Sequence, residues 1–180
     1  GTSTWLVLEI ALAELLGISI GTMTVVMGFV VLGIAMFSRE KIGWGTLGNI
    51  LSIGPWLNLF LGWISIPHES FALRIFLFLL AVAIIGVASA VYIGVDAGAG
   101  PRDSLMLAIH RITGLSVRAA RGSIEVVVVT IGWLLGGPAG WGTLAFALLI
   151  GPSVQWAFKL FNVRPHKAED VIVPAAAVED

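Results

Sequence analysis

Charged side chains gather in one segment of an otherwise apolar chain, where they could bind an anion or carry a proton. The segment runs from residue 98 to residue 125 and holds six candidate residues: Arg102, Asp103, Arg111, Arg118, Arg121 and Glu125. Arginine side chains bind anionic ligands and lipid headgroups. Basic residues beside membrane helices also fix which side of the membrane a loop occupies. The sequence leaves both interpretations of the arginines open.

Glu125 is the acidic residue of this segment that we expect inside a membrane helix. A carboxylate there is costly unless it is paired, and Arg121, at position i−4, or Arg118, at position i−7, is within reach. Acids inside membrane helices are candidate proton carriers, whereas an Arg–Glu pair near the interface can be a purely structural clamp. The sequence leaves both roles of Glu125 open.

A second candidate site, in the centre of the membrane, consists of two matched Gly-Pro interruptions, each followed by an amide side chain. It comprises Gly54, Pro55, Asn58, Gly151, Pro152 and Gln155. Proline removes a backbone donor and kinks or breaks a helix, and matched interruptions mark the binding site in transporters built from inverted repeats. The alternative is that the Gly-Pro pairs are packing kinks and that the amides bond to a neighbouring helix.

Other kinds of chemistry find no support in the residue pattern. The sequence contains no Cys, which excludes disulfides and thiolate sites. His110 has no second metal ligand at a suitable spacing, and the Gly-x-Gly motifs at residues 43–45 and 140–142 lack the Lys of a phosphate-binding loop. We therefore predict no enzymatic activity, no metal and no cofactor. The net charge of -1 argues against nucleic acid as a partner.

The composition is that of an integral membrane protein. Of the 180 residues, 58% are hydrophobic and 12% are charged, and the mean hydropathy is +1.00. This leaves too little polar surface for a soluble protein. The apolar residues form blocks of roughly 16 to 25, the length that an α-helix needs to cross a hydrocarbon core about 30 Å thick. The lipid bilayer is thus the first expected partner.

The blocks predict an all-α protein with five membrane helices and two short helices that do not span the bilayer. The predicted membrane helices cover residues 20–37, 46–64, 71–95, 118–135 and 143–161, and the short helices cover residues 4–16 and 101–113. We expect Gly17 and Gly114 to end the short helices and the hydroxyl of Thr46 to cap the following helix. Residues 163–180 are expected to form a mobile cytoplasmic tail.

The chain repeats itself with a constant offset of 97 residues. Gly-Trp-Gly-Thr-Leu at residues 43–47 recurs at residues 140–144, and the two Gly-Pro pairs fall into the same register. This predicts a first repeat over residues 1–64 and a second repeat over residues 65–162. Matched membrane helices are three crossings apart, so they must point in opposite directions, as in an inverted-topology repeat.

The membrane helix at residues 71–95 has no counterpart in this register. The counterpart would precede Gly1, and we therefore predict a three-plus-three protein whose first helix is missing from the sequence. If the C-terminus is cytoplasmic, nine of the ten basic residues lie on the cytoplasmic side, in keeping with the positive-inside rule. The prediction is a multi-pass protein of the cytoplasmic membrane with its C-terminus inside the cell.

Several motifs resemble a known family. Gly-Ala-Gly-Pro-Arg-Asp at residues 98–103, Gly-Leu-Ser-Val-Arg at residues 114–118 and the glycine-rich stretch at residues 132–143 are similar to the YczE-like branch of the YczE/YyaS/YitT group of bacterial membrane proteins. The resemblance implies a cytoplasmic-membrane protein of several helices, and no generally established activity comes with it. The first half departs from the pattern, with Thr4 and Leu6 where the second half has Pro101 and Asp103.

Two functions fit these observations. The first is a transporter-like protein for an unknown small molecule, with the Gly-Pro interruptions and their amides lining the central site. The second is a non-transporting membrane partner or regulator of another protein, acting through its cytoplasmic loop at residues 98–121. Under the first, substitution of the amides should abolish transport. Under the second, charge substitutions in the loop should break the association.

Overall fold

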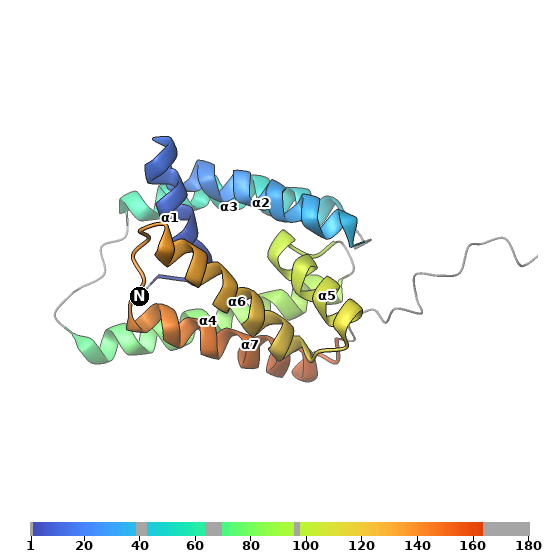
Figure 1. The fold of residues 1–180 in the computed structure, drawn as a ribbon. Coiled ribbons are helices and arrows are strands. Elements are labelled where there is room, and N and C mark those ends of the chain that lie inside the picture. The colour runs from blue at the N-terminus through green and yellow to red at the C-terminus, as the bar shows by residue number, and fades with distance from the viewer. Residues whose placement is uncertain (1, 39–42, 64–69, 96–97, 164–180) are drawn as a thin grey trace, which may run out of the picture.

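The structure is a computed structural model that describes residues 2–38, 43–63, 70–95 and 98–163. In these ranges all regular structure is helical (Figure 1). The helices are α1 (Thr4–Leu16), α2 (Ile20–Phe37), α3 (Trp44–Trp63), α4 (Phe71–Gly94), α5 (Pro101–Thr113), α6 (Val117–Leu134) and α7 (Trp141–Leu160). The expected tail at residues 163–180 lies outside the described residues, apart from Val163.

Three of the described helices are long and apolar enough to cross a membrane, namely α2, α4 and α7. The other two long helices are less apolar. Helix α3 contains Asn49 and Asn58, and α6 contains Arg118, Arg121 and Glu125. The described residues are therefore all-helical, with three helices able to span a membrane, whereas the count of five crossings remains a prediction.

Helix boundaries agree closely with the sequence prediction at the short helices. Gly17 and Gly114 end α1 and α5 in the left-handed conformation, with φ of 65° and 70°, which is accessible to glycine at little cost. Two residues further on, the hydroxyls of Ser19 and Ser116 accept the backbone N–H groups of Thr22 and Ala119 and begin α2 and α6.

The prediction for the start of the third helix needs a correction. Thr46 does not precede α3 but lies in its first turn, and its hydroxyl accepts the backbone N–H of Gly43 at 3.4 Å. The same hydroxyl donates to the carbonyl of Ala99 at 2.7 Å. Thr143 has the equivalent place in α7, where it accepts from Gly140 at 3.4 Å. Both helices therefore begin earlier than the sequence predicted, because the threonine bonds back to the residue before the helix.

The helices repeat with the offset seen in the sequence. Helices α5, α6 and α7 begin and end 97 residues after α1, α2 and α3; for example, α1 runs from 4 to 16 and α5 from 101 to 113. In Figure 1, α2 runs from left to right and α6 from right to left, and α3 and α7 are likewise opposed. The equivalent helices thus form two similar units of opposite direction.

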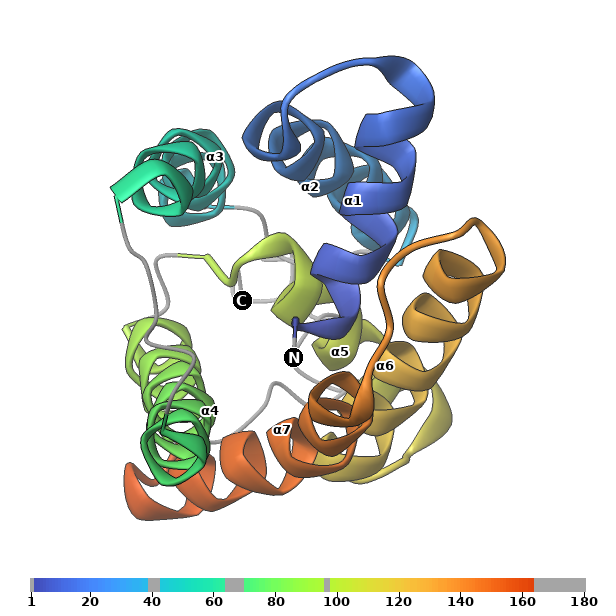
Figure 2. The same cartoon turned by 90° about the vertical axis from the view of Figure 1, so that its left-hand side faces the viewer.

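The two units are joined through their short helices. Helix α1 packs against α6, and α5 packs against α2, so each short helix lies on a long helix of the other unit. Figure 2 shows α5 near the middle of the molecule, with the long helices around it. Helix α4 packs mainly along α7, where Gly86 lies directly against Ser153.

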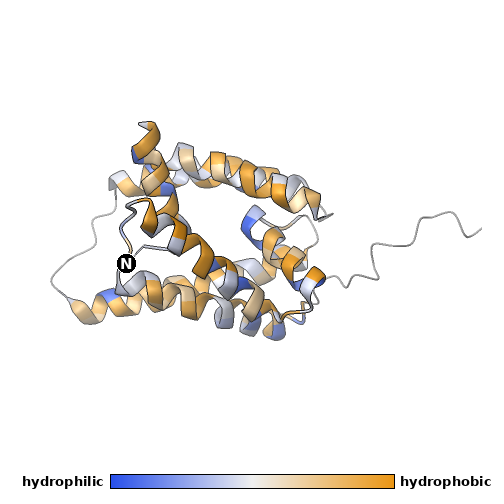
Figure 3. Cartoon of the chain, in the orientation of Figure 1, coloured by the Kyte–Doolittle hydropathy of each residue, from blue (hydrophilic) through white to orange (hydrophobic). Residues whose placement is uncertain are grey.

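The outer faces of the long helices are apolar, as a bilayer requires. Figure 3 shows apolar residues along these faces and a hydrophilic patch at the beginning of α5, inside the molecule. Trp44, Trp63, Trp133 and Trp141 lie at or near helix ends and are between 63% and 89% exposed. Tryptophan in this position is typical of the interface between hydrocarbon and headgroups.

Close packing of α2 and α3 depends on glycine, which leads to a testable prediction. A Cβ at Gly21 would lie 2.3 Å from the carbonyl oxygen of Gly54, whereas a Cβ at Gly33 would have no neighbour within 4 Å. We expect Gly21→Ala to lower the free energy of unfolding by about 1–3 kcal/mol, because the helices must move apart. The matched variant Gly33→Ala should be neutral or more stable by about 0.5–1 kcal/mol. Thermal unfolding in lipid bicelles measures both, and equal stabilities would contradict the packing.

Candidate functional site

The first turn of α5 directs two adjacent charged residues toward different partners. Pro101 occupies the first helical position, which suits its fixed φ and missing N–H. Arg102 forms an ion pair with Glu9 of α1, while Asp103 forms an ion pair with Arg121 of α6. One turn of one short helix therefore links α1, α5 and α6 through charged side chains.

Asp103, Arg121 and Glu125 form a buried triad. The distance from Arg121 Nη1 to Asp103 Oδ1 is 2.5 Å, and that from Arg121 Nε to Glu125 Oε1 is 2.7 Å. Asp103 and Arg121 are 6% and 5% exposed, and Glu125 is completely buried. The pairing of Arg121 with Glu125 at i,i+4 is one of the two that the sequence left open, the other being with Arg118. Asp103 joins it as a second carboxylate.

Hydroxyl groups complete the shell of the triad. Thr4 donates a hydrogen bond to Glu125 Oε2, and Ser89 of α4 donates to Asp103 Oδ2 at 3.3 Å. Glu125 Oε1 has no hydrogen-bond partner despite its short distance to Arg121 Nε. The contact is an ion pair in which the Nε–H bond of Arg121 does not point at Glu125 Oε1, so the atoms are close without a directed hydrogen bond. Glu125 thus keeps one oxygen without a directed hydrogen bond.

Glu9 is the centre of a second, smaller group. It is 1% exposed, accepts a hydrogen bond of 2.8 Å from the hydroxyl of Thr24 and pairs with Arg102. The guanidinium of Arg102 also lies over the ring of Trp5, 4.9 Å from its centroid, a favourable cation–π geometry. Each charge in this group has a partner of opposite sign.

The electrostatics of the triad are unbalanced. Two carboxylates face one guanidinium, and an uncompensated charge buried in a protein costs several kcal/mol. The N-terminal ends of α1 and α5 are nearby and favour negative charge, but a helix end contributes only about 0.3–1 kcal/mol and at most about 2 kcal/mol. Burial raises the pKa of the Asp103 carboxyl, and the positive charge of Arg121 acts in the opposite direction.

A cavity of about 220 Å³ lies against these charged groups. Its polar lining is drawn from five helices and comprises Thr24, Asn49, Ser89, Tyr92, Arg102, Asp103 and Arg121. Since water occupies about 30 Å³ per molecule, this volume and lining suit about seven waters or a small polar solute. The rest of the lining is apolar and includes Ile50, Ile53 and Ile85. We call this cavity the polar chamber because one of its walls carries the charged side chains.

The chamber continues toward one end of the molecule. A second hollow of about 470 Å³ shares Asn49, Tyr92 and Gly100 with it. The remaining lining residues lie in the first half of α3, the last turn of α4 and the segment before α5. This hollow therefore lies beside the chamber, at the end of the molecule that contains the start of α3 and the end of α4.

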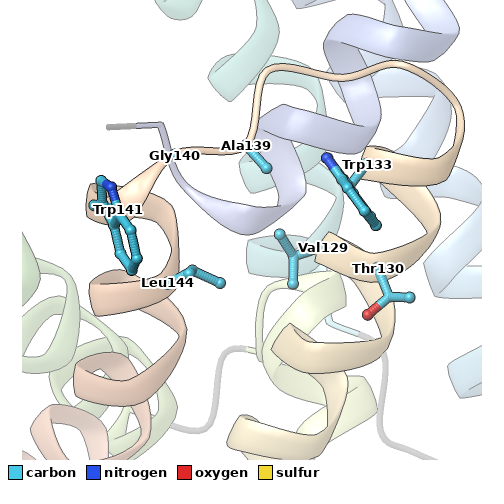
Figure 4. A pocket seen from close by; sticks show the side chains of 7 residues that line it. All are labelled: Val129, Thr130, Trp133, Ala139, Gly140, Trp141 and Leu144. Atoms are coloured by element: carbon cyan, nitrogen blue, oxygen red, sulfur yellow. The ribbon is translucent and has the colours of Figure 1, made fainter.

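Another hollow, of about 320 Å³, has a different character. It lies between the end of α6 and the start of α7 and is flanked by Trp133 and Trp141, with Val129 and Ala139 between them (Figure 4). It has no charged lining residue. Both tryptophans are exposed, so this hollow belongs to the surface expected at the membrane interface.

The two Gly-Pro pairs lie apart from the polar chamber. Helices α3 and α7 are continuous through Pro55 and Pro152, and none of the six residues predicted for a central site lines the chamber. Asn58 Oδ1 accepts the backbone N–H of Gly21 at 2.9 Å, and Gln155 Oε1 accepts the backbone N–H of Arg118 at 3.2 Å. Both amides thus bond to the start of a neighbouring helix, which favours the packing alternative.

The remaining arginines of the predicted cluster lie away from the triad. Arg111 donates to the carbonyl of Ser38 at the end of α2, where a positive charge favours the helix dipole. Arg118 is exposed. His110 Nδ1 lies 2.5 Å from the carbonyl oxygen of Leu115. In the part of the chain that the structure describes, no three potential metal ligands of the His, Cys, Asp or Glu types come together.

Sequence reasoning missed the part of the site that comes from the first repeat. Glu9, Thr4 and Thr24 contact charged residues of the cluster, and Ser89 contacts Asp103. A signal existed for Glu9, since an acid within an apolar helix requires a partner. No local pattern distinguishes the hydroxyls, because Thr and Ser are common in membrane helices whether or not they bind a charge.

Comparison with known proteins places the chain in a family. A family model described as "Family of unknown function (DUF6198)" matches residues 1–159. The chain belongs to this family. It is 33% identical over 152 residues to the "Uncharacterized membrane protein YczE" of Bacillus subtilis (strain 168), which covers 84% of this chain and 70% of that protein. The resemblance to YczE-like proteins is thereby confirmed, together with the membrane class.

A second family relative comes from another bacterium. The chain is 33% identical over 166 residues to an "Uncharacterized protein" of Haemophilus influenzae (strain ATCC 51907 / DSM 11121 / KW20 / Rd), which covers 92% of this chain and 76% of that protein. No solved structure matches the chain. The comparisons thus establish the family and the membrane class.

The triad makes a strong prediction about stability. Arg121→Met removes the only cation that faces both Asp103 and Glu125 in the described structure, so we expect a loss of about 3–5 kcal/mol in the free energy of unfolding. The matched variant Arg118→Met changes an exposed side chain of the same helix and should stay within about 0.5 kcal/mol of the natural protein. Denaturant unfolding in bicelles measures the difference. Two variants of equal stability would show that the triad does not hold the helices together.

Proposed function

We propose that this protein is a transporter-like membrane protein that moves a small polar solute or ion. The observation that carries the proposal is the polar chamber, in which Thr24 and Arg121 line the same cavity from different repeats. It lies against the ionic cluster, which consists of Glu9, Arg102, Asp103, Arg121 and Glu125. Ionisable residues inside a membrane protein are costly and typically mark solute or ion pathways. A protein that served only as a scaffold would not need a chamber of this kind.

We further propose that the chain is an inverted-topology repeat in the membrane, with α3 and α6 as crossings beside α2, α4 and α7. Two observations support this: equivalent helices begin and end 97 residues apart, and equivalent long helices run in opposite directions. Arg102 and Trp5 are equivalent positions, and they contact each other. Equivalent residues meet only near the axis that relates the two units, so the ionic cluster lies close to that axis, where transporters of this type bind their solutes.

The faces of α3 and α7 support the three-plus-three arrangement. Ile150 and Ala157 of α7 are completely buried, and α7 is covered by α4. The equivalent residues of α3, Ile53 and Phe60, are 41% and 47% exposed. A helix equivalent to α4 would cover this face of α3 and would also close the side of the chamber between α3 and α4.

The alternative function, a partner or regulator acting through residues 98–121, has less support. Most of this segment is helix α5, whose Asp103, Ser104, Met106 and Ala108 are buried. Its charged residues Arg102 and Asp103 bind to other helices of the same chain. The part left for a partner is the turn between α5 and α6 together with Arg118.

Access to the chamber from both sides of the membrane tests the proposal. The natural chain has no Cys, so a single introduced thiol can be followed without background. Ser89→Cys places it in the chamber. Alternating access predicts that a membrane-impermeant thiol reagent modifies this residue in both right-side-out and inside-out vesicles, because the chamber opens to each side in turn.

Ser153→Cys is the matched control for this experiment. Ser153 bonds to the carbonyl of Val82 at 3.0 Å, between α7 and α4 and away from the chamber, and its thiol should stay unmodified from both sides. Modification of Ser89→Cys from one side alone would contradict transport and favour the alternative of a regulator. Modification of both variants to the same extent would indicate a loosely packed protein rather than a pathway.

A further inference from the structure

We infer that the Asp103–Arg121–Glu125 triad holds one exchangeable proton, and that a proton is the ion coupled to the proposed transport. The first part stands on the geometry of the triad, and only the second part rests on the proposed function.

The charges of the triad require a neutralising partner. With both carboxyls ionised, the group would carry one negative charge in excess, because Arg121 is the guanidinium that contacts both acids. Glu125 is completely buried and Asp103 is 6% exposed, so solvent screens the excess charge only weakly. A single proton on either carboxyl makes the group neutral.

Charged groups on the neighbouring helices do not remove this excess. From α1, Glu9 is the acid closest to the cluster, and Arg102 of α5 already neutralises it. Tyr92 of α4 lines the chamber without a charge at neutral pH. Helices α2 and α3 contain no charged residue, and Lys159 of α7 and Arg74 of α4 are exposed. The triad therefore keeps one excess negative charge when both of its carboxyls are ionised.

The hydrogen bonds leave a place for the proton. Thr4 donates a hydrogen bond to Glu125 Oε2, and Ser89 donates one to Asp103 Oδ2. Glu125 Oε1 has no directed hydrogen bond. Because Arg121 lies between the two carboxyls, the proton belongs to the pair rather than to either acid. This differs from a purely structural Arg–Glu clamp, in which both charges would be fixed permanently.

The chamber supplies the route for exchange. Asp103 and Arg121 both line it, whereas Glu125 does not, so Asp103 is the carboxyl that meets solvent. In the exchange step a hydronium ion in the chamber gives its proton to a carboxylate oxygen, an O–H bond forms, and a water molecule remains. The reverse step releases the proton, so the triad can load on one side of the membrane and unload on the other.

Infrared difference spectroscopy tests for this proton directly. Purified protein in lipid nanodiscs is titrated from neutral to alkaline pH, and the carbonyl stretch of a protonated carboxyl is followed in H2O and D2O. We expect one buried carboxylic acid at neutral pH, whose band shifts in D2O and disappears on alkalinisation. Asp103→Asn and Glu125→Gln should each lose the whole band, since the remaining acid is then balanced by Arg121 alone.

Glu14→Gln, which changes an exposed acid of α1, is the matched control and should keep the band. The measurement on the natural protein decides the matter even if a triad variant fails to fold. A spectrum without a buried carboxylic acid at neutral pH would overturn the inference, and so would a band retained in both folded triad variants. Carboxylate bands that respond to Na⁺ in place of pH would also overturn it, by showing that a cation neutralises the triad.

The outcomes separate this inference from the proposed function. If Ser89→Cys is modified from both sides but no buried carboxylic acid is detected, the result supports transport and contradicts the bound proton. If a buried carboxylic acid is detected but Ser89→Cys is modified from one side alone, the result supports the bound proton and contradicts its role in coupling. Coupling itself predicts that the ratio of modification from the two sides changes between neutral and alkaline buffer, and that Asp103→Asn abolishes this change.

Discussion

A guanidinium between two buried carboxylates is the interaction on which the interior of this protein depends. A charge cannot lie in an apolar interior without a partner, and the partners of Arg121 come from two places, α5 and α6. Thr4 of α1 and Ser89 of α4 must also approach to satisfy the carboxylate oxygens. Four helices are thereby brought to one point, where the N-terminal ends of the two short helices lie close together.

The cluster also shows how two similar units have come to differ. The positions equivalent to Asp103, Arg121 and Glu125 in the first unit are Leu6, Thr24 and Gly28, so the charges of the triad belong to the second unit alone. The first unit instead contributes Glu9 and the hydroxyls of Thr4 and Thr24. The symmetric framework of helices therefore supports an asymmetric site, built from complementary side chains of the two units.

The contacts that join α3 to α2 and α7 to α6 are equivalent in the two units. Asn58 and Gln155 bond to the starts of α2 and α6, and Gly54 and Gly151 allow the backbones of these helices to come close. These interactions involve backbone groups, whose positions depend little on side-chain identity. The residues that first suggested a transport site by their symmetry thus hold the framework, and the chamber lies where the symmetry is broken.

The sequence by itself determined the membrane class, the repeat and nearly all helix boundaries. These follow from hydropathy and from local signals such as Gly17, Gly114, Ser19 and Ser116, which act within a few residues of their own position. It also offered Arg121 and Arg118 as partners of Glu125, since residues four or seven apart lie on the same face of a helix.

Tertiary structure decided the rest of the site. Nothing local relates Glu9 to Arg102 or Thr4 to Glu125, because these pairs are separated by 93 and 121 residues and meet only when the short helices cross between the units. Thr46 in the first turn of α3 likewise reaches a distant group, the carbonyl of Ala99. The charged segment contains four of the five charged residues of the ionic cluster. The fifth, Glu9, and the hydroxyls of Thr4 and Thr24 are brought to it by folding from the opposite end of the chain.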